Sequence, residues 1–200
     1  MLQMRLGRRQ VQRCHRNLRK SQCLPERLNL CEQQFVIDRQ RTPLINPTIV
    51  KTLVWPDEAA TAAFATQLAA ALTRAHLNAC IALHGDLGAG KTTFVRHLLQ
   101  ALGVQGRVKS PTYAVVEPYT VSAGEVWHFD FYRFSDPREW EDAGFRDIFA
   151  SAGLKLCEWP QNAAGVMPTP DLEIHIDVDA SEQRQITIHA LTPSGQELLA

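Results

Sequence analysis

A glycine-rich motif in the middle of the chain has the residue types needed to bind the phosphates of a nucleotide. Gly85, Gly90, Lys91 and Thr92 satisfy the Walker A pattern Gly-x-x-x-x-Gly-Lys-Thr in full. Glycines let the backbone wrap around phosphate oxygens with its N–H groups turned inward. The lysine reaches the β- and γ-phosphates, and the threonine hydroxyl ligates Mg²⁺. The motif therefore predicts binding of a nucleoside triphosphate together with magnesium.

Two carboxylates that follow apolar runs are candidates for the rest of a magnesium site. Asp130 ends the run at residues 126–129, and Glu158 ends the run at residues 154–157. Ligands in open α/β sheets bind at the carboxyl ends of the strands, so both acids could face the phosphates. Each could instead be a capped or ion-paired surface carboxylate, and the sequence leaves both alternatives open.

Other polar residues near these acids have weaker signals. The segment Ser110-Pro111-Thr112-Tyr113 could bring a hydroxyl to the metal or the γ-phosphate, as switch segments do, or it could be a simple turn. His128 and Tyr132 share the strand face of Asp130, and we interpret them as packing and hydrogen-bonding neighbours rather than proton-transfer groups. Trp159, beside Glu158, could belong to the core or to the site.

The motif needs a strand before it and a helix after it, and the flanking sequence predicts both. Residues 78–84 form an apolar run typical of a buried strand, and residues 91–102 fit a helix that Gly103 ends. Residues 52–55 predict an earlier strand, and Asp57 is a good N-cap for a helix running to residue 75.

Downstream of the motif, the pattern predicts a hairpin, a short helix and three further strands. The hairpin comprises residues 113–119 and 125–134 with a turn at 122–124, and the helix starts at Asp136-Pro137-Arg138-Glu139. The later strands are residues 154–157, 171–178 and 184–191, followed by a turn at 193–195. We expect an α/β fold of the P-loop NTPase type over residues 50–200, with a mixed central sheet flanked by helices.

The charge is divided unevenly along the chain. Residues 1–45 hold ten Lys or Arg and three acids, whereas residues 46–200 hold eleven and eighteen. This division predicts a basic segment appended to an acidic domain. An acidic domain lacks a broad surface for gripping a phosphate backbone, so we do not expect it to bind nucleic acid by itself. No stretch approaches the roughly 20 apolar residues of a membrane helix, so no membrane association is expected.

We expect residues 1–49 to be a basic, disordered extension. Three interpretations stay open: a disordered tail, an organelle-targeting segment, or translated sequence upstream of the true start. We favour the last because a complete domain follows. Of the five cysteines, Cys80 and Cys157 lie in apolar runs and are interpreted as buried thiols, which suits a reducing cytoplasm. A zinc site of Cys14, His15, Cys23 and Cys31 is conceivable, but its spacings are not those of common structural sites.

Four motifs in order resemble the TsaE (YjeE) family. They are residues 85–93, Val108-Lys109-Ser110-Pro111-Thr112-Tyr113, His128-Phe129-Asp130-Phe131-Tyr132-Arg133 and Glu158-Trp159-Pro160. The resemblance runs from about residue 51 to the end of the sequence. It implies a cytoplasmic P-loop ATPase of tRNA threonylcarbamoyladenosine (t6A) biosynthesis that uses ATP and Mg²⁺. It also implies that the protein acts with TsaD and TsaB, resets that pair between turnovers, and meets tRNA only through the complex.

The resemblance also implies roles for individual residues. Lys91, Asp130 and Glu158 would be catalytic, and Thr92, Asp130 and Glu158 would serve the magnesium. The nucleotide would be bound by Glu58, Gly88, Ala89, Gly90, Lys91, Thr92, Thr93 and Thr112. The place of Glu58 follows from the strand–helix junction that covers the nucleotide in the family.

Three rival functions share the glycine loop. A small-molecule kinase needs an acceptor pocket and usually an Arg-rich lid, for which only Arg138 and Arg146 are available between residues 136 and 153. A GTPase normally carries an Asn-Lys-x-Asp motif, which does not occur here. A binding module would hold ATP without turning it over.

Overall fold

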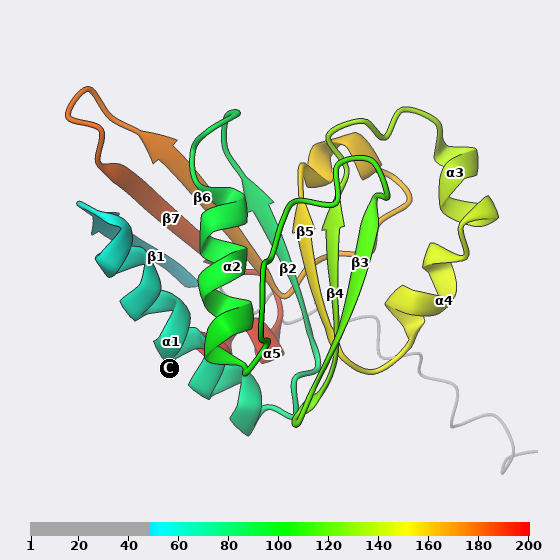
Figure 1. Cartoon of the computed structure of the whole chain (residues 1–200), viewed down its shortest axis with the longest axis horizontal. Helices are drawn as coiled ribbons and strands as arrows, with labels where there is room; N and C mark the ends of the chain where they lie inside the picture. Colours follow the sequence, from blue (N-terminus) through cyan, green and yellow to red (C-terminus); the bar gives the residue numbers. More distant parts are fainter. Residues whose placement is uncertain (1–48) are drawn as a thin grey trace, which may run out of the picture. The chain divides into compact units, whose positions relative to one another are not determined.

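The strand that leads into the glycine loop, β2 (Ala79–His84), lies in the middle of a mixed sheet. A computed structural model describes residues 49–200, and within them the strands lie in the order β1-β7-β6-β2-β5-β4-β3 (Figure 1). The other strands are β1 (Ile49–Trp55), β3 (Val116–Val121), β4 (Gly124–Asp130), β5 (Leu154–Glu158), β6 (Leu172–Val178) and β7 (Arg184–Ala190). β2 pairs in parallel with β5 and β6, and β5 with β4, whereas β1, β3 and β7 pair antiparallel. The predicted mixed sheet is confirmed.

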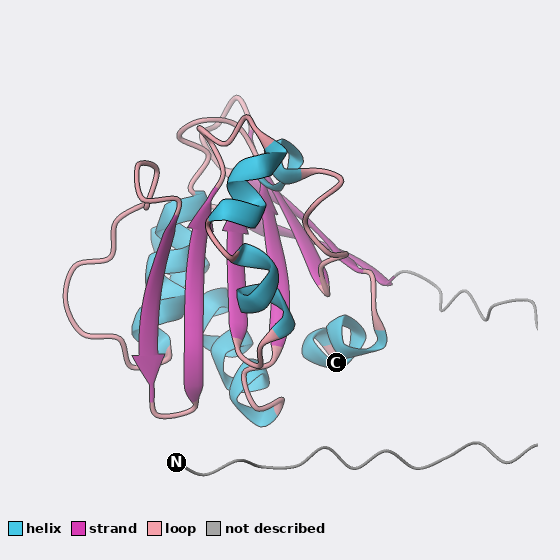
Figure 2. Cartoon of the chain, turned by 90° about the vertical axis from the view of Figure 1, so that its right-hand side faces the viewer, coloured by secondary structure: helices cyan, strands magenta, loops and turns pink. Residues whose placement is uncertain are grey.

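Helices cover both faces of this sheet. α1 (Glu58–Arg74) and α2 (Lys91–Ala101) lie side by side on one face, and α3 (Pro137–Asp142) and α4 (Phe145–Ala150) lie at the β3–β4 side (Figures 1 and 2). A 3₁₀ turn, η1 (Pro160–Ala163), follows β5, and α5 (Pro193–Leu199) packs against β7 and α1. The carboxyl ends of the parallel central strands lie together at one edge of the sheet, where the glycine loop begins.

Two apolar clusters hold these layers together. The larger cluster joins α1 and α2 to alternate residues of β2, β5, β6 and β7, among them Leu83, Leu156 and Ile174. The smaller one joins Phe129 and Cys157, on the opposite face of β4 and β5, to Trp140 and Phe145 of the short helices. Because successive strand residues point to opposite faces, each cluster takes every second residue of the shared strands. His128, Asp130 and Glu158 therefore share the face of α2.

Most predicted elements lie where the pattern placed them, with boundary differences that have local causes. The first hairpin strand begins at Val116 rather than at residue 113, because Val115 has φ of 65° and its N–H closes a turn onto the Pro111 carbonyl at 2.7 Å. The second strand ends at Asp130, whose carboxylate accepts from the Tyr132 N–H at 3.0 Å. The predicted turn at 193–195 instead opens α5, capped by the Thr192 hydroxyl.

Some expectations concern residues that were placed differently or not described. β1 begins three residues before the predicted strand and pairs along its whole length with β7. Residues 1–48, to which the predicted basic extension and the Cys14–Cys31 alternative belong, lie outside the described part of the chain. Within residues 49–200, none of the helices has the length and hydropathy that crossing a membrane requires.

Candidate functional site

The glycine loop leaves β2 at Gly85 and enters α2 at Lys91, as the motif predicts. Gly85 has φ of 139°, and a Cβ there would collide with the carbonyl oxygen of Ile176 on β6. Gly90 caps α2 in a left-handed conformation, with φ of 114°. Both positions therefore require glycine. The first N–H groups of α2, an eleven-residue helix, point toward this loop and form a positive end suited to an anion.

Lys91 lies inside the loop rather than in solvent. Its ammonium donates to the carbonyl oxygens of Gly85 at 2.7 Å and Asp86 at 2.9 Å, and it lies 4.0 Å from the centroid of the Trp159 ring. Burial lowers the pKa of Lys91, against the opposing effect of Glu158, Asp130 and Asp86. The charged side chain is thus held in the loop by two carbonyls and an aromatic face, all of them weaker partners than a phosphate.

Glu158 connects the start of α2 to the strand beside it. The Thr92 hydroxyl lies 2.9 Å from both carboxylate oxygens of Glu158, and His128 Nε2 lies 2.8 Å from Oε1. His128 is fully buried, and no described residue hydrogen-bonds its Nδ1. From the sequence, His128 was interpreted as a packing and hydrogen-bonding neighbour on the strand face of Asp130, and the structure identifies its hydrogen-bond partner as Glu158.

Asp130 is surrounded by hydrogen-bond donors from the segment at residues 110–113 and from its own turn. Thr112 Oγ1 donates to Asp130 Oδ2 at 2.8 Å, the Ser110 hydroxyl donates to the same oxygen, and the Tyr132 N–H donates to Oδ1. The two hydroxyl oxygens also lie 2.6 Å apart. The segment at 110–113 is therefore tied to Asp130 through side chains.

These groups offer the kind of oxygen donors that a magnesium ion requires. Asp130 and Glu158 are opposite one another on parallel β4 and β5, and both are buried. Carboxylate and hydroxyl oxygens are the ligands that Mg²⁺ prefers, and one or two carboxylates per site are usual. Asp130, Glu158 and the Thr92 hydroxyl fit this requirement, and the charges of both carboxylates act on Lys91.

The remaining predicted residues divide into two groups. Gly88, Ala89, Gly90 and Thr93 lie in the loop or in the first turn of α2. Glu58 lies instead at the start of α1, where its carboxylate is 2.8 Å from His97 Nε2 and 3.5 Å from Arg96 of α2. Its side chain is 63% exposed. The structure thus gives Glu58 a contact between the two helices, separate from the Asp130–Glu158 pair.

Two aromatic contacts beside the site were not predicted from the sequence. The Arg133 guanidinium lies 4.5 Å from the centroid of the Tyr113 ring, which is 86% exposed. Tyr132 meets Trp159 with ring centroids 5.0 Å apart. The aromatic character of positions 113, 132 and 159 was the available signal, but only the fold brings these side chains to one end of the sheet.

Comparisons with known proteins agree on one family. A family model described as "Threonylcarbamoyl adenosine biosynthesis protein TsaE" matches residues 55–186. A protein of Haemophilus influenzae named "tRNA threonylcarbamoyladenosine biosynthesis protein TsaE" is 40% identical over 147 residues, which cover 72% of this chain and 92% of that protein. A Bacillus subtilis protein of the same name is 36% identical over 56% of this chain and 69% of its own length.

A solved structure shares the fold. The crystal structure of Bacillus subtilis YdiB matches with a TM-score of 0.58 and 28% sequence identity, covering 76% of this chain and 93% of that one.

Proposed function

Because this chain belongs to the TsaE family of threonylcarbamoyladenosine biosynthesis proteins, we propose that it binds and hydrolyses ATP with magnesium in t6A formation, acting on a TsaD–TsaB complex. In this proposal hydrolysis resets the complex between turnovers, and the threonylcarbamoyl transfer itself takes place on the partners. The single observation that carries the ATPase proposal is the convergence of Lys91, Thr92, Asp130 and Glu158 at the end of parallel strands β2, β4 and β5.

Lys91 is the residue proposed to bind the β- and γ-phosphates. Its ammonium is bonded to two carbonyls of the loop, Gly85 and Asp86, and would exchange them for phosphate oxygens when a nucleotide binds. Charge-assisted hydrogen bonds to an anion are about twice as strong as those to neutral acceptors. The loop N–H groups and the amino end of α2 would hold the remaining phosphate oxygens.

Thr92, Asp130 and Glu158 are proposed to hold the metal. A magnesium ion held by these residues would offset the negative charge that develops on the phosphates during hydrolysis. The Thr92 hydroxyl, which donates to Glu158 in this structure, would turn its oxygen lone pair to the metal. His128 would keep the Glu158 carboxylate oriented through the buried contact at Oε1, which makes it a positioning residue.

The segment at residues 110–113 is proposed to report the state of the site. Ser110 and Thr112 both bond Asp130, so any change at that carboxylate alters the contacts of the segment. Tyr113 at the end of the segment is largely exposed. A carboxylate inside the site is in this way linked to a side chain on the surface, which is the arrangement of a switch segment.

Exposed apolar side chains around the site support a protein partner there. Leu87 of the loop is 76% exposed, and Tyr113 and Tyr132, which belong to the segments that bond Asp130, are also exposed. Large apolar groups gathered at one place mark interaction surfaces more often than isolated ones do. The excess of acids in residues 46–200 favours contact with proteins over direct contact with tRNA, which would be met through the complex.

The contacts of two arginines favour hydrolysis over the alternative of a small-molecule kinase. Arg138 pairs with Asp136 at 2.6 Å, and Arg146 pairs with Glu141 at 3.2 Å. Both guanidinium groups are largely exposed and held by local acids. Neither contact resembles a lid over the phosphates.

The proposal is tested by titrating the full chain with MgATP in a calorimeter and by following the fate of the γ-phosphate. We expect binding of MgATP and release of inorganic phosphate when TsaD and TsaB are present. Transfer of the phosphate to a metabolite from a candidate panel, without free phosphate, would instead support the kinase. Binding without either product would leave a nucleotide-binding module.

A further inference from the structure

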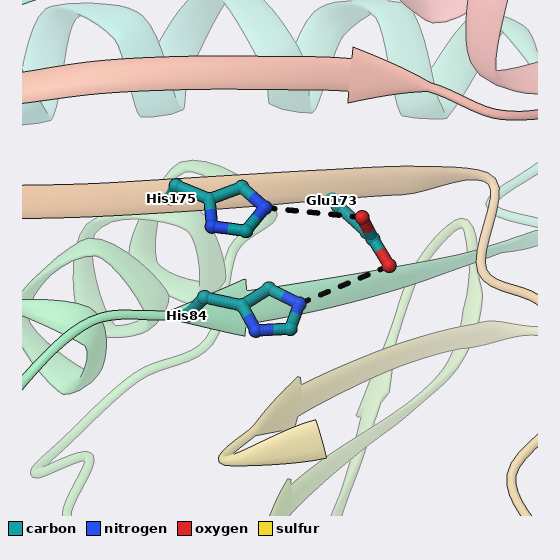
Figure 3. A group of neighbouring side chains, drawn as sticks. All are labelled: His84, Glu173 and His175. Carbon is teal, nitrogen blue, oxygen red and sulfur yellow. Dashed lines mark ion pairs between the residues drawn. The ribbon is translucent and has the colours of Figure 1, made fainter. Parts of the chain in front are cut away.

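Two histidines and a glutamate gather on the sheet face opposite α1 and α2. His84 ends β2, and it is paired in register with His175 on the parallel strand β6. Glu173 lies two residues before His175, so its side chain leaves the same face. Leu83, Ile174 and Ile176 alternate with these residues and point into the core beneath α1 and α2. The three polar side chains therefore share the other face, behind the start of the glycine loop (Figure 3).

Both histidines turn Nε2 toward the Glu173 carboxylate (Figure 3). His84 Nε2 lies 3.9 Å from Glu173 Oε1, and His175 Nε2 lies 3.8 Å from Glu173 Oε2. The two imidazole rings stack with centroids 4.4 Å apart and an interplanar angle of 6°. One nitrogen of each histidine and the carboxylate lie within 4.8 Å of one another (Figure 3). Sequence-distant donors are thus brought together by the β2–β6 pairing.

The contacts inside this group are too long to satisfy its members. Separations of 3.8–3.9 Å exceed those of hydrogen bonds. His84 Nε2 is buried, and it has no hydrogen-bond partner among residues 49–200. Buried polar nitrogens are normally paired, so this one needs an explanation. Burial, followed by the neighbouring His175, lowers the pKa of His84, which favours the neutral imidazole that metals bind.

We propose that His84, Glu173 and His175 bind a divalent transition-metal ion of the zinc class. Nitrogen and oxygen ligands about 2.1 Å from one tetrahedral ion are about 3.4 Å apart, so each histidine-to-Glu173 separation would shorten by roughly half an ångström, and the two stacked rings would turn toward the ion. Two histidines with one carboxylate are an established zinc ligand set that leaves a fourth position open. The His189 ring lies edge-on to His175 with centroids 5.4 Å apart, close enough to influence that position.

This site differs from the proposed magnesium site in chemistry and in place. Imidazole nitrogens select zinc, nickel or copper, whereas the Asp130–Glu158 site offers only oxygens. The bound ion would tie β2 to β6 through side chains immediately before Gly85, which itself touches the backbone of Ile176. It would therefore brace the base of the glycine loop from the face opposite the nucleotide.

The test is a zinc titration of the full, untagged chain without nucleotide, with competition against a metal indicator. Three variants each remove one ligand: His84→Gln, His175→Gln and Glu173→Gln. The matched control is His76→Asn, at an exposed position whose φ of 54° asparagine tolerates. Because Cys14, His15, Cys23 and Cys31 could also take zinc, the result is the difference between variant and parent.

We expect the parent and the control to bind one zinc equivalent that each ligand variant loses, with affinity lowered by about 100-fold or more. Cobalt in place of zinc should give the visible bands of a four-coordinate nitrogen–oxygen site, without thiolate-to-metal bands from this site. Equal zinc stoichiometry and affinity in all five proteins would overturn the proposal. So would the lack of a nitrogen–oxygen cobalt spectrum in the parent, which does not depend on any variant folding.

Discussion

Asp130 and Glu158 lie opposite each other on adjacent parallel strands, and their carboxylates have different partners. Asp130 is bonded by Ser110 and Thr112, and Glu158 by Thr92 and His128. One acid is therefore linked to the segment at 110–113, and the other to the glycine loop. Replacement of either acid should interrupt a different part of the same site.

Asp130→Asn and Glu158→Gln keep side-chain shape and remove charge. Each should lower ATP hydrolysis by about 100-fold or more, because each removes the charge of a proposed metal ligand, and Asp130→Asn should also raise the magnesium concentration needed. Phosphate release in the presence of TsaD and TsaB measures both effects. Asp142→Asn, at an exposed carboxylate of α3, is the control and should hydrolyse at the parent rate. If either test variant hydrolysed ATP at the rate of the parent, the replaced residue would have no role in the proposed site.

Lys91→Ala should weaken MgATP binding and abolish hydrolysis. A charged hydrogen bond to phosphate is worth about 1.5–3 kcal/mol, so affinity should fall roughly 10- to 150-fold. Isothermal titration gives the affinity, and Lys51→Ala, at an exposed lysine of β1, should bind as the parent does. If Lys91→Ala matched the parent in both affinity and turnover, the loop would not be the nucleotide site.

Much of this site is predictable from sequence because its chemistry is local. The loop from Gly85 to Thr92 is recognisable from the spacing of its glycines, lysine and threonine, and the acids at 130 and 158 each end an apolar run. The hydrogen bonds from Ser110 and Thr112 to Asp130 were not predictable, because they join residues 18 to 20 positions apart. They require the turn at Val115, which shortened the predicted strand.

The His84–Glu173–His175 group shows the same limit more strongly. Glu173 and His175 are two residues apart on a predicted strand, which was the one local signal. Their contact with His84 depends on β2 pairing with β6 in a particular register, across about ninety residues of chain.

The helix α4 was not predicted for another reason, because six residues are too few to establish a helical period.

Cys157 should make stability depend on alkaline pH. Burial raises the pKa of this thiol well above its ordinary value of 9.0. Above about pH 9 the unfolded chain releases the proton while the folded chain keeps it, so the free energy of unfolding falls as pH rises. The slope is at most about 1.4 kcal/mol per pH unit.

Cys157→Ala removes this pH dependence. Comparison of the variant with the parent therefore separates the contribution of the thiol from those of other groups, among them Lys155, whose pKa is lowered by burial. Urea unfolding at pH 7.5, 9 and 10 gives the comparison. The stability difference between parent and variant should be constant up to about pH 9 and then shift against the parent. A difference that stays constant to pH 10 would show that the thiol ionises normally in the folded chain.

Deletion tests whether the basic segment contributes to the stability and nucleotide affinity of the domain that follows it. Removal of residues 1–48 should leave the melting temperature and MgATP affinity nearly unchanged, because the segment is expected to be disordered and an unpacked tail contributes little to a core. Thermal unfolding and calorimetric titration of both forms measure this. A fall of many degrees would mean that the segment contributes to the folded domain.

Phosphate release with and without TsaD and TsaB measures whether this site hydrolyses ATP in response to its proposed partners. We expect slow release from the isolated chain and stimulation of at least about tenfold by the pair, since groups supplied in trans can complete a phosphoryl-transfer site. MgATP, compared with ADP, should also change the affinity for the pair, because binding couplings are reciprocal. The proposal would be wrong if phosphate were released at the same rate with and without the pair, and if the affinity for the pair were the same with MgATP and ADP.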